Sequence, residues 1–151
     1  MALYSFFVEA ILHIEQLEIM NTKLRQFEAD VSQLDLLNNV AASSEDEQNA
    51  MLDNRDRKPF DPEWVRVDQA VKQLETNQQL SNEDKAAINE LRETTFKKTY
   101  RVVENGELAG YVSDDFDLIA RALIVDYHDA WLDALWMQYQ TGNFPHGELL
   151  G

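Results

Sequence analysis

The stretch that decides the fold is residues 113–142, which read SDDFDLIARALIVDYHDAWLDALWMQYQTG. From Phe116 onward the apolar side chains fall on almost every side of an α-helix, which is typical of a helix at the centre of a core. Aspartates at its start suit the positive end of a helix dipole, and Gly142 suits a helix C-terminus. The pattern therefore predicts a buried C-terminal helix over about 114–141, capped by Ser113.

Just before this stretch the pattern changes from helical to β-prone. The run Thr99–Val103 (TYRVV) is rich in residues that favour strands, and a second such run ends at Val112. Between them lies Asn105-Gly106, the dipeptide most typical of a two-residue β-turn. We expect a small two-stranded hairpin over about 99–112.

The N-terminal third of the chain carries a long helical stripe. Its apolar residues recur every three or four positions, as on one face of an α-helix: Leu3, Phe7, Ala10, Ile14, Leu17, Met20, Leu24, Phe27, Val31 and Leu34. Tyr4, Val8, Leu12 and Ile19 add a second apolar face to the first part of this helix. We therefore expect the first half of the helix to be more deeply buried than the second half.

The middle of the chain predicts shorter helices. Three helix starts are marked by side chains suited to capping: Ser44 with Glu47, Asp61 with Pro62, and Ser81 with Asp84. The polar segment 43–60 is the best candidate for a flexible insertion. With 151 residues, the chain has the usual length of one domain. The fold class that follows is mainly α: a single-domain helical bundle over residues 1–151, with a small β-hairpin before the C-terminal helix.

The net charge of −15 is concentrated at the two ends of the chain. Residues 1–54 carry 2 basic and 10 acidic side chains, residues 55–101 carry 10 and 9, and residues 102–151 carry 1 and 9. If the first and last helices pack together, their outer faces form one negative surface. Such a surface would attract basic proteins and repel phosphate backbones and anionic membranes, although acidity also serves solubility alone.

The residue patterns that usually carry catalysis are missing from the sequence. The chain has no Cys, only 5 Gly, no Gly-x-Ser-x-Gly turn and no His preceded by Glu three positions earlier. We therefore expect no enzyme activity and no cofactor. An alternative is a divalent-metal-dependent all-α hydrolase that uses Glu90, Glu93 and the carboxylates between Asp126 and Asp133.

The candidate partner-binding residues are acidic side chains and one tryptophan. Asp126, Asp129 and Asp133 are spaced to share one face of the predicted C-terminal helix. A tryptophan beside carboxylates would provide an anchor with an acidic rim, as interface hot spots often have. The full set of candidates is Asp114, Asp115, Asp126, Asp129, Asp133 and Trp131, with Glu45, Asp46 and Glu47 as an outlying patch.

These features favour an acidic protein-binding module that blocks a basic partner protein, of the inhibitor, immunity or antitoxin type or a nucleic-acid mimic. The alternative is a helical assembly or adaptor protein whose long first helix pairs with another copy or another helix. We expect no direct binding of nucleic acid and no membrane insertion, because the basic clusters are small and no apolar run reaches about 20 residues. A homo-oligomer fits the sequence as well, and we expect a cytoplasmic location.

Overall fold

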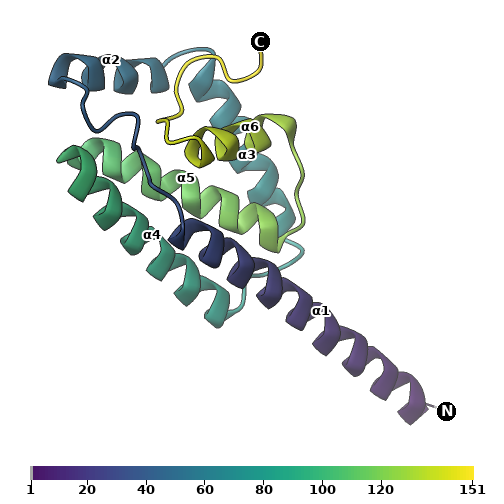
Figure 1. Cartoon of the computed structure of the whole chain (residues 1–151). Coiled ribbons are helices and arrows are strands. Elements are labelled where there is room, and N and C mark those ends of the chain that lie inside the picture. Colours follow the sequence, from purple (N-terminus) through teal and green to yellow (C-terminus); the bar gives the residue numbers. More distant parts are fainter. Residues whose placement is uncertain (1) are drawn as a thin grey trace.

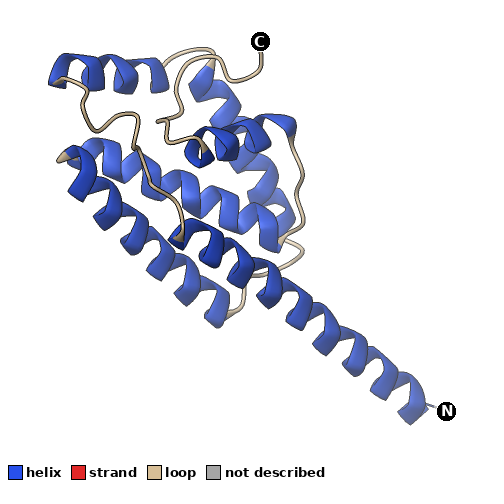
Figure 2. Ribbon diagram, in the orientation of Figure 1, coloured by secondary structure: helices blue, strands red, loops and turns tan. Residues whose placement is uncertain are grey.

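The computed structural model describes residues 2–151, apart from the side chains of residues 16–21, and it is built from α-helices (Figure 1). In chain order the described helices are α1 (Ala2–Ser32), α2 (Glu45–Arg55), α3 (Phe60–Glu75), α4 (Asn82–Val103), α5 (Gly106–Ile124) and α6 (Ala130–Gln140). Figure 2 shows only helices and loops, and no β-strand occurs within residues 2–151. The prediction of a mainly α fold is confirmed.

The predicted β-hairpin over about 99–112 is wrong, because its two runs are the end of α4 and the start of α5. Glu104 takes the left-handed conformation at the end of α4, with φ of 51°. Asn105 then caps α5, since its side chain accepts hydrogen bonds from two backbone N–H groups in the first turn. Thr95 and Thr99 are buried on α4, so packing overrides their preference for strands.

The predicted C-terminal helix over about 114–141 is two helices, α5 and α6, and Ser113 lies inside α5 rather than at its start. Between the two helices the chain reverses through Asp126, whose φ is 58°. Aspartate tolerates this left-handed conformation better than most residues do. Asp129 then caps α6 through hydrogen bonds from the backbone N–H groups of Trp131 and Leu132.

The predicted capping boxes at Ser44 with Glu47 and at Ser81 with Asp84 are confirmed at the starts of α2 and α4. The segment 43–60, the candidate for a flexible insertion, thus contains a capped helix. The helix predicted to start at Asp61 is present as α3, which begins at Phe60, but the predicted cap is wrong because no side chain caps this helix.

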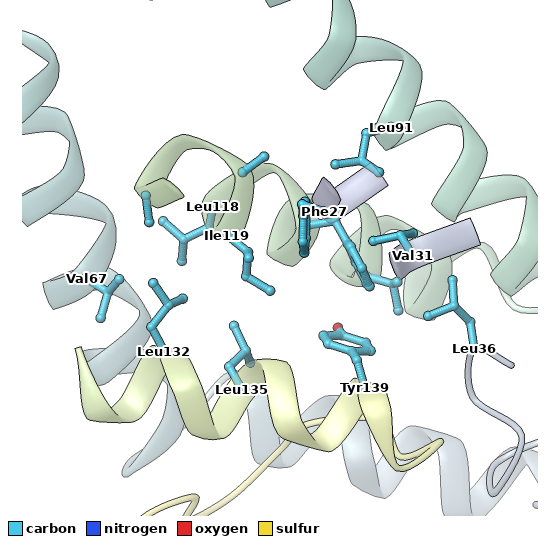
Figure 3. Close-up of a cluster of buried hydrophobic side chains, with 14 of the residues drawn as sticks. Phe27, Val31, Leu36, Val67, Leu91, Leu118, Ile119, Leu132, Leu135 and Tyr139 are labelled. Atoms are coloured by element: carbon cyan, nitrogen blue, oxygen red, sulfur yellow. The ribbon is translucent and has the colours of Figure 1, made fainter. Parts of the chain in front are cut away.

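The core is centred on α5, in agreement with the prediction that the apolar stretch after residue 113 lies at the centre. Phe116 and Leu118 of α5 are completely buried. Figure 3 shows Phe27 and Val31 of α1, Leu118 and Ile119 of α5, and Leu132, Leu135 and Tyr139 of α6 converging on one cluster, with Val67 of α3 and Leu91 of α4 at its edges. Helices from both ends of the chain therefore share one core.

The burial of α1 is the reverse of the prediction. Its second half supplies buried Leu24, Phe27 and Val31, whereas Leu3 is 72% and Phe7 is 59% exposed. Figure 1 shows the first half of α1 extending away from the other helices, which agrees with the exposure of its apolar side chains. The side chains of Leu17, Ile19 and Met20 lie outside the described residues. Within the described part of the chain, no helix is long and apolar enough to span a membrane.

Candidate partner-binding groove

A groove with a volume of about 510 Å³ lies between α1 and the junction of α5 with α6. Its floor is apolar and includes Phe27, Ile119 and Leu132. It is lined by Thr22, Lys23, Gln26, Phe27 and Asp30 of α1, by Ile119, Ala122 and Leu123 of α5, by Asp126, Tyr127 and His128 of the connection, and by Leu132, Asp133 and Trp136 of α6.

The rim of the groove is acidic, and two of its carboxylates have no cationic partner. Within the described part of the chain, neither Asp30 nor Asp133 forms an ion pair, and both are exposed. Asp126 is paired: its Oδ1 lies 2.9 Å from Nε2 of His128 and 3.2 Å from Nζ of Lys23. The hydrogen bonds from His128 and Lys23 hold the pKa of Asp126 below its usual value, which favours its charged form.

The groove thus combines an apolar floor with a carboxylate rim, and it lies where the two most acidic parts of the sequence meet. A family model for immunity protein PIM1 matches residues 26–146.

The chain belongs to this immunity protein family.

No curated protein matches the chain. The region matched by the PIM1 family contains the groove apart from Thr22 and Lys23, and it contains α2 to α6. It begins at Gln26, so the first 25 residues, which include the exposed half of α1, lie outside it. The family assignment agrees with the immunity type of function among those that the sequence favoured.

Asp129, a predicted rim residue, has its carboxylate engaged within the PIM1-family chain itself. Besides capping α6, it accepts hydrogen bonds from Nη1 and Nη2 of Arg66 at 2.8 and 3.2 Å. The Arg66 hydrogen bond holds the pKa of Asp129 below its usual value. Its position therefore fixes α6 against α3, and Asp129 is less available to a partner than Asp30 or Asp133.

Asp115, another predicted binding residue, is completely buried. Its Oδ2 accepts hydrogen bonds from Nη1 of Arg55 at 2.6 Å and from the Tyr139 hydroxyl at 2.5 Å. Its Oδ1 accepts from Nη2 of Arg55 and from Nε1 of Trp64, both at 2.8 Å. Asp115 therefore connects α2, α3 and α6 to α5 from inside the core and does not face a partner.

Arg55 is the counter-ion of Asp115. Its guanidinium carbon lies 4.3, 4.9 and 5.2 Å from the ring centroids of Phe60, Tyr111 and Phe144. Burial alone would lower the pKa of Arg55, but the Asp115 carboxylate outweighs burial and raises it above its ordinary value. The spacing of these residues along the chain does not indicate the network.

The tryptophan predicted as an exposed anchor, Trp131, is only 3% exposed and packs against Phe60, with ring centroids 5.0 Å apart. Trp136, five residues further along α6, is partly buried and lines the groove instead. Its ring lies 5.1 Å from that of Phe27. The surface therefore has an aromatic side chain beside carboxylates, as expected, but a different tryptophan provides it.

The remaining predicted residues lie away from the groove. Asp114 is partly exposed and pairs with Arg92 at 2.7 Å. Glu45, Asp46 and Glu47 form the first turn of α2, which we call the α2 patch. A hydrogen bond from Asn105 to Gln48 places α2 at the start of α5 (Figure 1). The groove is lined by Ile119, Ala122 and Leu123 towards the other end of α5, about 20–25 Å from its start at 1.5 Å per residue.

The carboxylates proposed for a metal site do not come together. Glu93 lies on α4 and pairs with Lys97, whereas Asp126 and Asp133 lie at the groove. Among the described residues, no three His, Asp or Glu side chains are placed to hold a metal ion. The geometry of the described chain therefore offers no support to the hydrolase alternative.

Proposed function

We propose that this immunity protein neutralises a toxin by binding it through the groove, and that the toxin presents an apolar side chain beside Lys or Arg residues. The observation that carries the proposal is the pairing of an apolar floor with unpaired Asp30 and Asp133 on its rim. Family membership supplies the class of function, since an immunity protein protects against a toxin.

The chemistry of the groove favours a basic partner. Asp30 accepts a hydrogen bond from Gln26 at 2.9 Å, and Asp133 lies in the first turn of α6. A partner cation can pair with each carboxylate without breaking an ion pair of the free protein. The partly buried side chains of Leu123, Tyr127 and Trp136 line the groove and offer apolar surface that a partner can remove from water, which is the usual source of interface affinity.

We propose further that protection comes from binding alone, without catalysis, and that it takes place in the cytoplasm. The absence of Cys agrees with a reducing compartment. Cell fractionation with an antibody against the chain tests the location, and a result that places the protein in another fraction would contradict it. Recovery of an unmodified, active toxin after the complex is dissociated tests whether protection comes from binding alone.

The first experiment is an affinity pull-down from the source cells, with the bound proteins identified by mass spectrometry. The column is washed at about 50 mM and at about 500 mM salt, because screening weakens exposed ion pairs at the higher concentration. We expect one basic protein, retained at low salt and weakened at high salt, whose toxic activity is lost when the complex is reconstituted. A partner with an acidic contact surface, or a Kd that does not change with salt, would contradict the proposal.

A further inference from the structure

The exposed half of α1, residues 2–15, is an apolar surface that the immunity function leaves unexplained; we call it the arm. Eight large apolar side chains of the arm are between 39% and 79% exposed: Leu3, Tyr4, Phe6, Phe7, Val8, Ile11, Leu12 and Ile14. At on the order of 100 Å² each, they expose roughly 800 Å². This exceeds the largest apolar patch of a typical monomer and equals one partner's share of a standard interface.

The arm has the residue spacing of a helix that pairs with other helices. Leu3, Phe7, Ala10 and Ile14 follow steps of four, three and four, which is the heptad spacing of a coiled-coil seam. A second row of Tyr4, Val8 and Ile11 lies about 100° away around the helix. The two rows offer separate faces for two neighbouring helices.

Most polar residues of the arm lie in one narrow strip. Ser5, Glu9 and His13 follow each other at steps of four, so they form one row opposite the apolar rows. Glu15 is the exception, since it ends the second apolar row four residues after Ile11. With about 100° per residue, the apolar arc spans roughly 240° of the helix circumference. One neighbouring helix covers an arc of about 100°, so a single partner helix would leave much of the apolar surface in water.

The composition of the arm argues against a lipid surface. Helices that lie on membranes usually carry Lys or Arg on their polar face, and the first such residue in this chain is Lys23. The chain's net charge of −15 also repels anionic headgroups. The arm lies outside the region matched by the family, so toxin recognition common to that family does not depend on it.

We propose that the arm binds the arms of further copies of the same chain, forming a helical bundle of more than two arms. The two rows supply self-complementary apolar surface, as a symmetric assembly requires. Figure 1 shows the arm extending away from the other helices, which we call the body of the chain. The bundle of arms therefore forms at a distance from the groove, and the acidic bodies stay apart. Salt screens the repulsion between bodies and therefore strengthens the assembly, the opposite of its effect on toxin binding.

Sedimentation equilibrium of the full chain tests the proposal, at about 1–100 µM protein and at about 50 and 500 mM salt. We expect a mass at least three times the 17.5 kDa of the monomer, with more assembly at the higher salt. Phe7→Glu with Ile14→Glu should give the monomer mass. Ser5→Glu with His13→Glu adds two carboxylates to the polar strip of the same arm and should leave the mass of the wild-type assembly unchanged.

Thermal unfolding of each variant shows whether the body has kept its fold, since the arm contributes no described residue to the core. A wild-type mass of 17.5 kDa at every concentration would overturn the proposal, as would an assembly that the Phe7 and Ile14 substitutions leave intact. Flotation with neutral and with anionic vesicles tests whether the arm binds a lipid surface instead of other arms. A chain that stays monomeric in solution but floats with vesicles would assign the arm to a membrane surface and overturn self-association.

Discussion

Asp115→Asn removes the negative charge that balances buried Arg55, while keeping a side-chain oxygen for the hydrogen bond from Trp64. Both charged side chains are almost completely buried, at 0% and 4% exposure. The guanidinium is enclosed by Phe60 and two other rings, so water cannot replace the lost carboxylate. The substitution therefore leaves an uncompensated charge in the core without a large change in volume.

Removal of one partner of a buried ion pair costs about 3–5 kcal/mol of unfolding free energy. For a chain of this length, each kcal/mol lowers the melting temperature by about 2–4 °C, so we expect a decrease of about 6–20 °C. Asp114→Asn is the matched control at the neighbouring position. Its ion pair with Arg92 is partly exposed, so the expected loss is below about 1 kcal/mol.

The assay is urea and thermal unfolding followed by circular dichroism, with Arg55→Met and the double variant Arg55→Met with Asp115→Asn completing a double-mutant cycle. The double variant contains neither charge, so it should be more stable than the sum of the two single losses predicts, with a coupling of about 1–3 kcal/mol. Equal losses for Asp114→Asn and Asp115→Asn, or additive losses in the cycle, would refute the assigned role of the buried pair.

Two further substitutions test other parts of the fold. Asp129→Ala removes the cap of α6 and the ion pair to Arg66, and should cost at least about 1 kcal/mol in the same urea assay; a loss no larger than that of Asp133→Ala, one turn further on, would contradict the capping role. Burial and the charge of Arg55 lower the pKa of His146 below its ordinary value of 6.5. The unfolded chain therefore binds a proton first as the pH falls, and stability that is present above pH 6.5 is lost below it. His146→Gln should therefore make the free energy of unfolding depend less on pH between about pH 7 and 5. An unchanged pH dependence would contradict the lowered pKa of His146.

The helices were largely predictable because their signals are local. Ser44 with Glu47 and Ser81 with Asp84 place a side-chain acceptor and a carboxylate three residues apart, and the structure contains both capping boxes. The stretch after residue 113 places apolar side chains on almost every side of a helix, which indicates a position at the centre of the core. Caps and periodicity depend only on neighbouring residues, so one sequence is enough to find them.

The hairpin error came from a dipeptide with two uses. Asn105 before Gly106 suits a β-turn, but Asn105 is also a good helix cap, and the preceding Glu104 takes the left-handed conformation that ends α4. The buried row Leu91, Thr95, Thr99 continues at helical spacing into the supposed strand. Giving that spacing more weight than the β preference of threonine would have predicted the helix.

The candidate site was predictable in kind but not in its residues. The acidic ends of the chain do meet at the groove, and Asp126 and Asp133 lie on its rim. Sequence spacing could not show that Asp115 points inward to Arg55, because they are 60 positions apart in the chain. Nor could it show which of Trp131 and Trp136 faces the groove, since that depends on where α6 begins.

The groove is tested most directly by the Kd for the captured toxin, measured calorimetrically at about 50 mM salt for two charge-matched variants. One variant carries Asp30→Asn with Asp133→Asn at the groove, and the other carries Glu45→Gln with Asp46→Asn in the α2 patch. We predict that the groove variant binds about tenfold or more weakly and that the α2 variant stays within about twofold of the wild type. A groove variant that binds like the wild type, or an α2 variant that loses as much affinity, would contradict the assignment of the groove as the toxin-binding site.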